Sequence, residues 1–240
     1  MPKSAAKVLF FLVMAALPAQ AIAQEADTFD IASSSVYFPH RFQPKKFMME
    51  IAMSQVKLPF DWLETAVQAP LFHFHAVYGL PRGFALDGRF STLFVSNQFL
   101  AGPHWNYQSG NASFNVGYDI AYTYGFLNQF GFASTAQSWI NYPNVSVGFK
   151  FKDVAFTLKA EAQIVTYFST KQGENEISTE RNFNNGFTLA LYMEQRIHKD
   201  KVIVLGLKNS HAKYHFMAWP AFTTFNRFYN IPEFYVGLIL

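Results

Sequence analysis

The chain has 240 residues, of which 50% are hydrophobic, 18% aromatic and 15% charged, with a formal net charge of +3 and no cysteine. The absence of cysteine excludes a disulfide framework and a thiolate zinc site, and the small net charge gives no electrostatic reason to expect nucleic acid as a partner. The 28 phenylalanines need either a large dry core or a lipid solvent.

Residues 1–23 are typical of a secretory signal peptide. Lys3 and Lys7 precede an apolar stretch from Val8 to Pro18, and Ala21-Ile22-Ala23 fits a small-x-small cleavage site. A retained membrane anchor is the less favoured alternative, because the apolar stretch is short and a cleavage site follows it. Removing the two lysines leaves 17 basic and 16 acidic residues, so the mature chain is almost neutral.

Residues 24–70 form an N-terminal segment with little regular patterning, which we expect to be periplasmic. A short helix is predicted near 61–68, because Asp61 can cap its start and Pro70 lies just beyond its end. One more strand is indicated by an apolar alternation at Phe47, Met49, Ile51 and Met53.

Residues 71–240 carry the strongest pattern in the chain, and its clearest part is 112–126. Every even position there is apolar or aromatic, and every odd position is small or polar. This alternation of period two is longer than a typical strand of a soluble protein, and it covers the ~9–11 tilted residues that cross a bilayer. It therefore predicts a strand with one face toward lipid.

Turn signals divide 71–240 into eight strands, and ten is the alternative if 31–57 contributes a hairpin. Short turns at 109–111, 152–153 and 198–200 alternate along the chain with longer loops predicted at 127–136, 169–182 and 216–228. Short periplasmic turns and longer outer loops are typical of transmembrane β-barrels. We predict an all-β, antiparallel transmembrane β-barrel, with a soluble exported sandwich as the competing fold.

The signal peptide, the alternating strands and the C-terminal FYVGLIL resemble small bacterial outer-membrane β-barrel proteins. In that family the last strand is the signal that the barrel-assembly machinery reads. Phe234, Val236 and Leu238 fit the family pattern, although the chain ends on Leu240 where the family usually has Phe. The resemblance implies localisation in the outer membrane of a Gram-negative bacterium, with outer-membrane lipid and the assembly machinery as partners, and it carries no activity.

Charged and imidazole side chains occupy inward positions of the predicted strands. An eight-stranded barrel is just wide enough for side chains to fill it, and charges inside it must pair. We therefore expect a polar network that fills the lumen, with a polar path or site as the alternative. Its predicted members are His73, His75, Asp87, Arg89, Asp119, Lys159, Glu161, Glu194, Arg196 and Lys208.

No motif assigns a catalytic residue, a cofactor or a metal. His73 and His75 are two apart on one strand face, but no third metal ligand is marked by its spacing. His73 with Ser91 or Ser96 would make a base and a nucleophile, although the sequence does not bring them together. Trp219 in the loop 216–228 is expected to pack over the barrel mouth, with contact to a surface partner as the alternative.

The function predicted from the sequence is an outer-membrane barrel with a largely filled lumen. Its role would be structural or accessory, or an interaction with a surface or envelope protein. A narrow channel for small solutes is the first alternative, and a lipid-modifying outer-membrane enzyme is the less favoured second one.

Overall fold

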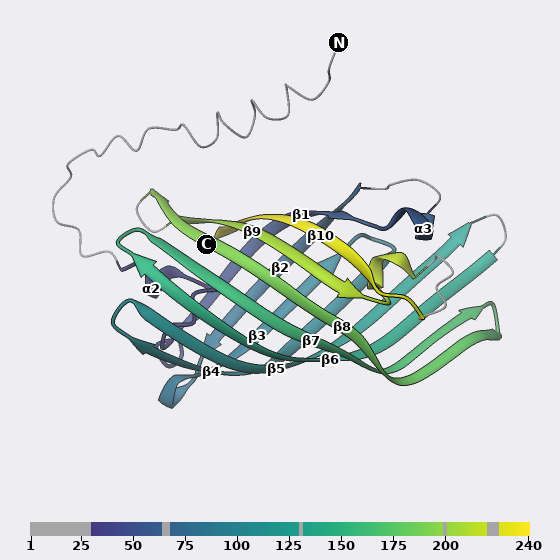
Figure 1. Cartoon of the computed structure of the whole chain (residues 1–240), viewed down its shortest axis with the longest axis horizontal. Coiled ribbons are helices and arrows are strands. Elements are labelled where there is room, and N and C mark those ends of the chain that lie inside the picture. Colours follow the sequence, from purple (N-terminus) through teal and green to yellow (C-terminus); the bar gives the residue numbers. More distant parts are fainter. Residues whose placement is uncertain (1–29, 64–67, 130–131, 199–200, 220–225) are drawn as a thin grey trace, which may run out of the picture.

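The computed structural model describes residues 30–63, 68–129, 132–198, 201–219 and 226–240. Within these ranges ten antiparallel strands close into a barrel in which β1 pairs with β10 (Figure 1). The strands are β1 (Phe47–Lys57), β2 (Gln68–Gly79), β3 (Phe84–Thr92), β4 (Ser96–Ser109), β5 (Ala112–Gln129), β6 (Phe132–Phe151), β7 (Val154–Gln172), β8 (Asn175–His198), β9 (Lys201–Ala212) and β10 (Tyr229–Ile239). The predicted signal peptide, residues 1–23, lies outside the described residues.

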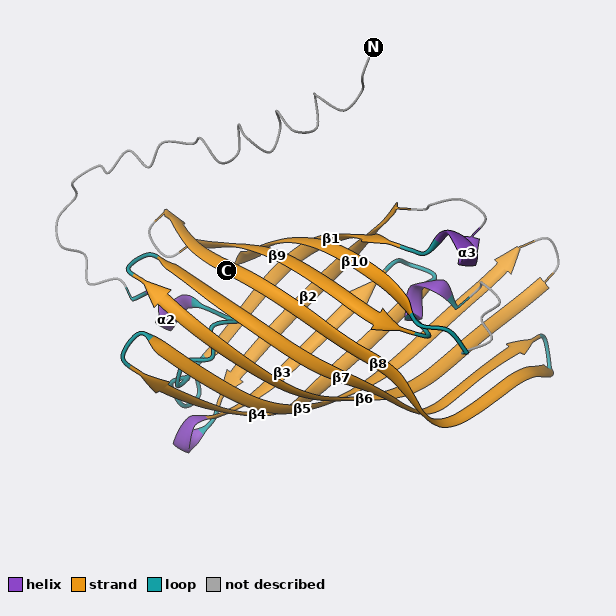
Figure 2. Ribbon diagram, viewed as in Figure 1, coloured by secondary structure: helices purple, strands orange, loops and turns teal. Residues whose placement is uncertain are grey.

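The helical elements are short, as Figure 2 shows. They are α2 (Ile31–Ser34), α3 (Phe60–Leu63), η1 (Pro81–Gly83) and η2 (Phe216–Ala218). None of the helices in the described ranges is long and apolar enough to cross a membrane. The helix predicted near 61–68 overlaps α3, which begins one residue earlier at Phe60; residues 64–67 lie outside the described residues, and Gln68 belongs to β2.

The barrel has ten strands, the number given as the alternative, but 31–57 supplies one strand and not the predicted hairpin, and the two extra strands have different origins. The first extra strand is β1, which contains the alternation noted at residues 47–53. The barrel therefore begins before residue 71, the start predicted from the sequence. The second arises because 84–107, expected to hold one strand, bends back on itself at Leu93-Phe94-Val95. This turn has no Gly, Pro or Asn; it is closed by the Leu93 N–H donating to the Ser96 carbonyl at 2.9 Å, with Phe94 at φ 57°.

The two ends of the barrel differ in how the strands are joined. At the short-turn end, brief turns such as 110–111 and 152–153 connect the strands, and the C-terminus lies there (Figure 1). At the opposite, long-hairpin end, the hairpins β5–β6 and β7–β8 extend as long arms, and β6 stays paired with β7 as far as Ser134 and Gln172 (Figure 1). The predicted loops 127–136 and 169–182 are therefore mostly strand. Their pairing depends on the backbone ladder, because arms with both faces wet need no apolar alternation.

Apolar side chains cover the outside of the barrel. Phe114, Ile120 and Leu189 are 38%, 47% and 48% exposed, whereas the inward Asp119 is fully buried. A sandwich would bury the first three against one another, so the soluble alternative is wrong. Exposed apolar side chains around a closed sheet fit a lipid solvent, in which every strand must find a partner. The predicted transmembrane β-barrel is confirmed.

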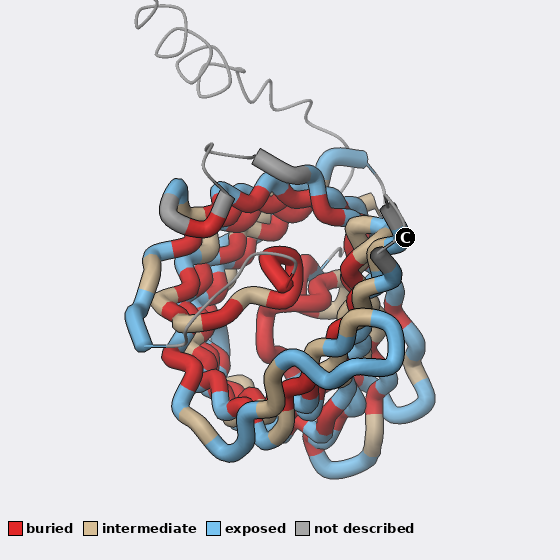
Figure 3. Tube along the Cα trace, turned by 90° about the vertical axis from the view of Figure 1, so that its right-hand side faces the viewer, coloured by how far each residue is buried: buried red, intermediate tan, exposed pale blue. Residues whose placement is uncertain are grey.

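Two segments of chain fill the lumen from opposite ends. Residues 30–46, here called the plug, enter at the short-turn end, where the Lys45 N–H donates to the Gly79 carbonyl. Residues 213–219, here called the cap, fold inward at the long-hairpin end, where η2 contacts β4 and β5. Figure 3, which faces the long-hairpin end, shows buried chain inside the ring of strands. Phe38 in the plug and Trp219 in the cap are both buried.

Candidate functional site

A single carboxylate fixes the plug inside the barrel. Glu194 of β8 is fully buried and points into the lumen. The backbone N–H groups of Val36 and Tyr37 donate to its Oε1 at 2.7 and 3.0 Å, and the Phe38 N–H donates to its Oε2 at 2.7 Å. Three consecutive N–H groups around one carboxylate form an anion-binding nest of backbone dipoles. Because three buried N–H groups depend on this one acceptor, Glu194 anchors the plug to the wall.

Tyr37 extends this anchor across the lumen. Its hydroxyl donates to the Tyr235 hydroxyl at 2.8 Å, which in turn donates to Glu50 Oε2 at 3.0 Å. Its ring stacks on Tyr192 with centroids 3.9 Å apart, and the Arg89 guanidinium lies 5.7 Å over the same ring. Residues of β1, β3, β8 and β10 therefore all hold one plug side chain.

Tyr37 separates two small polar cavities. The cavity toward the short-turn end has a volume of about 30 Å³, and the one toward the cap about 60 Å³. A water molecule needs roughly 10–15 Å³ on this measure, so each cavity has room for only a few water molecules.

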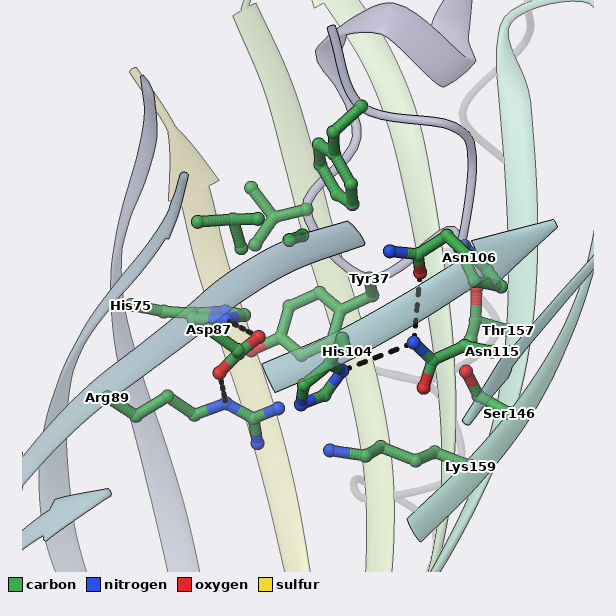
Figure 4. Close-up of a pocket in the computed structure, with 15 residues that line it drawn as sticks. Tyr37, His75, Asp87, Arg89, His104, Asn106, Asn115, Ser146, Thr157 and Lys159 are labelled. Carbon is green, nitrogen blue, oxygen red and sulfur yellow. Dashed lines mark hydrogen bonds and ion pairs between the residues drawn. The ribbon is translucent and has the colours of Figure 1, made fainter. Parts of the chain in front are cut away.

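An ion-pair cluster on β1, β2 and β3 forms one wall of the smaller cavity (Figure 4). His75 Nε2 lies 2.8 Å from Asp87 Oδ2, and its Nδ1 lies 3.4 Å from Glu50 Oε2. Arg89 Nε lies 3.3 Å from Asp87 Oδ1. The fold brings these groups together because His75 and Arg89 are register partners on neighbouring strands, and Asp87 shares the inward face of β3.

A second cluster on β4 to β7 forms the facing wall. His104 Nε2 lies 2.8 Å from Asp119 Oδ1, and the Asn144 side-chain amide donates to Asp119 Oδ2 at 2.9 Å. Lys159 Nζ lies 2.6 Å from Glu161 Oε1 and 3.9 Å from Asp119 Oδ2. Figure 4 shows His104 and Lys159 across the cavity from His75 and Asp87.

The two clusters approach each other closely enough to raise the question of a metal. Asp87, His104 and Asp119 each offer a ligand atom within 4.8 Å of the others. Both carboxylates, however, already lie beside permanent cations, Arg89 and Lys159. Ligands that must also neutralise a guanidinium and an ammonium fit an ion-pair network better than a divalent cation. His73 and His75, the pair noted in the sequence, turn to separate partners.

His73 lies at the larger cavity, between two serines and a carboxylate. Its Nδ1 lies 2.9 Å from Ser91 Oγ, and its Nε2 lies 2.8 Å from Ser54 Oγ and 3.5 Å from Glu233 Oε1. Lys208 Nζ lies 2.9 Å from the other Glu233 oxygen. The structure thus brings together His73 and Ser91, one of the two pairings that the sequence left open.

Nine of the ten predicted lumen residues lie in these contacts. The tenth, Arg196, is near the short-turn end of β8, where its backbone N–H donates to the Asp153 carbonyl. Sequence reasoning missed Glu50, Glu233 and Tyr37. The signal for the first two was their inward position on β1 and β10, whereas nothing in the sequence around Tyr37 marks it.

Neutral contacts hold the cap. The Trp219 indole N–H donates to Ser96 Oγ at 3.0 Å. The Asn185 side chain accepts from the Tyr214 N–H at 2.8 Å and donates to the Tyr214 carbonyl at 2.9 Å. Burial lowers the pKa of His215 to about 4, so this ring is neutral in the cap near pH 7.

Comparison with known proteins returns weak structural similarities. No family model matches the chain, and no curated protein matches it. It is similar to Ail, the attachment invasion locus protein of Yersinia pestis (9% identity, TM-score 0.38, covering 82% of this chain and 100% of that one). It is also similar to Neisserial surface protein A (12% identity, TM-score 0.38, covering 81% of this chain and 96% of that one). A third similar structure is the P. putida toluene transporter TodX (10% identity, TM-score 0.35, covering 85% of this chain and 70% of that one). Similarities at this level leave the function to be inferred from the barrel itself.

Proposed function

We propose that this protein is a bacterial outer-membrane β-barrel that its own N-terminal plug keeps closed, with a structural, accessory or surface-interaction role. The observation that carries the proposal is the bonding of three consecutive plug N–H groups to the buried Glu194. A segment that merely rested in the lumen would not place its backbone donors on one carboxylate of the wall.

The orientation follows from the two ends. Bacterial barrels keep short turns on the periplasmic side and longer extensions outside. We therefore assign the short-turn end and the plug to the periplasm, and the arms and the cap to the outer surface. β10 closes the barrel against β1, which fits a last strand read by the assembly machinery during insertion. Outer-membrane lipid surrounds the apolar belt, and the exposed arms are the natural contact for an envelope or surface partner.

The test of closure is a conductance measurement on the full-length mature chain in planar bilayers. The plug, Tyr37 and the cap leave cavities of only about 30 and 60 Å³, so we expect no stable, well-defined pore. Sustained conductance steps from the wild-type protein would overturn the proposal and support the narrow-channel alternative, for which ten strands are enough. Refolding is checked by heat-modifiable electrophoretic mobility.

A second candidate function, ester hydrolysis, is favoured by the contact between Ser91 Oγ and His73 Nδ1 at 2.9 Å. In this scheme His73 Nδ1 takes the hydroxyl proton as Ser91 Oγ bonds to the ester carbonyl carbon. The proton then leaves with the alcohol, and water hydrolyses the acyl-serine to the free acid. Glu233 lies 3.5 Å from His73 Nε2, where it orients the imidazole and stabilises its charged form. A cavity of about 60 Å³ restricts the acyl group to a few atoms.

A fluorophosphonate probe tests this second candidate in outer-membrane vesicles. A reactive Ser91 forms a covalent adduct that Ser91→Ala abolishes and His73→Ala strongly reduces. Ser210→Ala is the matched control, because Ser210 lines the same cavity but bonds to Thr188, and it should leave labelling unchanged. The probe carries only methyl substituents, so that it matches the few-atom acyl group that the cavity admits, and absence of an adduct on the folded wild-type barrel would eliminate the hydrolase.

A further inference from the structure

Basic residues lie where the plug joins the wall, at the short-turn end of the barrel. The Lys45 N–H of the plug donates to the Gly79 carbonyl at 2.9 Å, and the Gly79 N–H donates to the Lys46 carbonyl at 2.9 Å. Arg82 stands three residues beyond Gly79, in η1 of the β2–β3 turn, and Figure 2 shows this turn at the short-turn end. The root of the plug and the β2–β3 turn are therefore neighbours.

The contact between these two backbones fixes how far apart the cations are. A Cβ at Gly79 would lie 2.1 Å from the Gln43 carbonyl oxygen, so only glycine allows this approach. Three residues span at most about 11 Å, so Arg82 lies within that distance of the residue that bonds to Lys45. Lys45 and Arg82 are both exposed. Because both side chains are long, a single headgroup is within reach of both.

The charge of this patch is one-sided. Glu50 and Asp87, the first acidic residues that follow Lys45 and Arg82 in the sequence, are buried in the lumen. Asp30, the acidic residue before Lys45, is bonded to a lysine of β6. The two exposed cations are therefore not neutralised by the acidic side chains nearest to them in the sequence.

Other parts of the same rim are different. In the β6–β7 turn Lys152 is followed directly by Asp153, so that turn carries both signs of charge. Leu240, after β10, donates its N–H to the Met49 carbonyl on the other flank of β1, whereas Arg82 is on the β2 side. The patch is thus confined to the side of the barrel where β1, β2 and β3 end.

Aromatic side chains continue the patch onto the outer wall. Phe47 pairs with Tyr78, and Phe84 pairs with Trp105. All four rings face outward and are between 39% and 60% exposed. Phe47 and Phe84 each stand two residues after one of the two cations. Outward aromatic rings followed by basic side chains are typical of the level at which hydrocarbon gives way to headgroups.

We propose that Lys45 and Arg82 together bind the phosphate of an anionic glycerophospholipid headgroup at the short-turn end, the periplasmic side in the proposed orientation. Ammonium and guanidinium groups are the usual partners of phosphate oxygens. A lipid is the ligand because the aromatic rings place both cations directly beyond the hydrocarbon.

The bound headgroup links the plug to the wall. Lys45 belongs to the plug and Arg82 to the β2–β3 turn, so one phosphate between them holds the plug at its root. This inference rests on the docked plug of the proposed function and adds the lipid class that secures it.

The experiment compares the lipids retained by the full-length mature barrel. The barrel is reconstituted in phosphatidylcholine vesicles doped with phosphatidylglycerol, whose headgroup has a net negative charge, and native mass spectrometry counts the lipids that stay bound in detergent. We expect about tenfold preference for phosphatidylglycerol, corrected for its share of the vesicle lipid, and loss of this preference in Lys45→Gln/Arg82→Gln. Equal retention of the two lipids by the wild type would overturn the proposal.

The matched control is Lys152→Gln/Lys201→Gln. It removes the same charge at the same end, from the β6–β7 turn and the start of β9, and Lys152 has a positive φ of 47° like the 66° of Lys45. We expect this control to prefer phosphatidylglycerol as the wild type does. Equal loss in both variants would reduce the patch to the general charge of the rim and overturn the proposal. Heat-modifiable mobility shows that each variant is folded.

Hydrogen exchange tests the link to the plug. Phosphatidylglycerol should slow exchange of the Lys45 amide in the wild type and leave it unchanged in Lys45→Gln/Arg82→Gln; equal exchange of the wild type with and without this lipid would contradict the link. Soluble glycerophosphoglycerol, at the concentration of the doped lipid, should displace little phosphatidylglycerol because it lacks acyl chains, and full displacement would contradict a lipid ligand.

Conductance recorded on the same samples separates the two proposals. A wild type that conducts but still prefers phosphatidylglycerol would refute closure of the lumen and leave the lipid site standing. A closed barrel without the preference would refute the lipid site alone.

Discussion

The plug and the cap close opposite ends of one lumen by different physical means. The plug is held by a buried carboxylate that accepts three backbone hydrogen bonds, and by Tyr37 between aromatic rings and ionic groups. The cap is held by neutral hydrogen bonds at Ser96 and Asn185, and by apolar packing around Trp219. Both segments bury apolar side chains, among them Ile31 and Phe38 of the plug, but only the plug is also bonded through three consecutive N–H groups to one carboxylate. Loss of that one acceptor should therefore release the plug, whereas the cap, whose contacts are spread over several groups, should yield gradually.

The most disruptive change for this comparison is Glu194→Ala. It leaves three buried N–H donors without their acceptor, which destabilises the plugged state by roughly 4 kcal/mol. We expect a defined conductance to appear in planar bilayers, with the barrel itself still heat-modifiable. Glu180→Ala removes the same charge from an exposed position on the β7–β8 arm, and it should stay closed. If the Glu194→Ala barrel showed no conductance, the plug would not be anchored by this carboxylate.

Trp219→Ala tests the cap in the same way. Loss of a buried indole and of its bond to Ser96 should cost about 3 kcal/mol of local stability. Because Tyr37 and the plug still block the lumen, the expected result is water access to the cap side without conductance. Hydrogen exchange at the Tyr214 amide measures this access, with the outward-facing Trp105→Ala as control. Conductance from Trp219→Ala would place the main seal at the outer end instead.

Acid should loosen the plug through His40. Burial lowers the pKa of His40 to about 4 from an ordinary value of 6.5, with its ring packed 4.0 Å from that of Phe42. The unfolded or released plug therefore binds the proton more tightly than the docked plug. The stability from neutral His40 is fully present above pH ~6.5 and falls as the pH drops toward ~4, by about 2 kcal/mol at pH 5.

The measurement is conductance against pH for wild type and His40→Phe. The wild type should open more readily at pH 5 than at pH 7, and the variant should lose part of this dependence. Identical pH profiles for the two proteins would show that the acid response arises in groups other than His40.

The smallest effect is expected from Lys150→Ala. Lys150 Nζ lies 2.7 Å from Asp30 Oδ1 at the plug entrance, where the Asp30 side chain is 53% exposed. Burial raises the pKa of Asp30, but the hydrogen bonds from Lys150 and from the Ala32 N–H, together with the positive charge of Lys150, outweigh burial and hold that pKa below its usual value. An exposed pair of this kind contributes less than about 1 kcal/mol. Thermal unfolding should shift slightly and conductance should not change; opening of the barrel would show the anchor to be shared with this pair.

The hairpin at Leu93-Phe94-Val95 and the β7–β8 arm show where sequence reasoning about the fold stops. The pattern of period two finds strands that have one face in lipid, because only there does hydrophobicity alternate. It does not find a turn built from apolar residues, nor strands whose two faces are both wet. The apolar turn caused β3 and β4 to be predicted as one strand, and the wet arm was predicted as a loop; the other strand missing from the count of eight, β1, was indicated by its alternation but placed outside the barrel.

The sequence by itself determined the barrel and most of the side chains inside it, because alternation alone decides which residues face lipid and which face the lumen. Only the tertiary structure decided which of them meet, such as His73 with Ser91, because pairing depends on the register between strands. It also decided the role of the plug. Val36 and Glu194 are 158 residues apart in the sequence. Their contact uses a backbone N–H, which every non-proline residue carries, so no side-chain pattern could predict it.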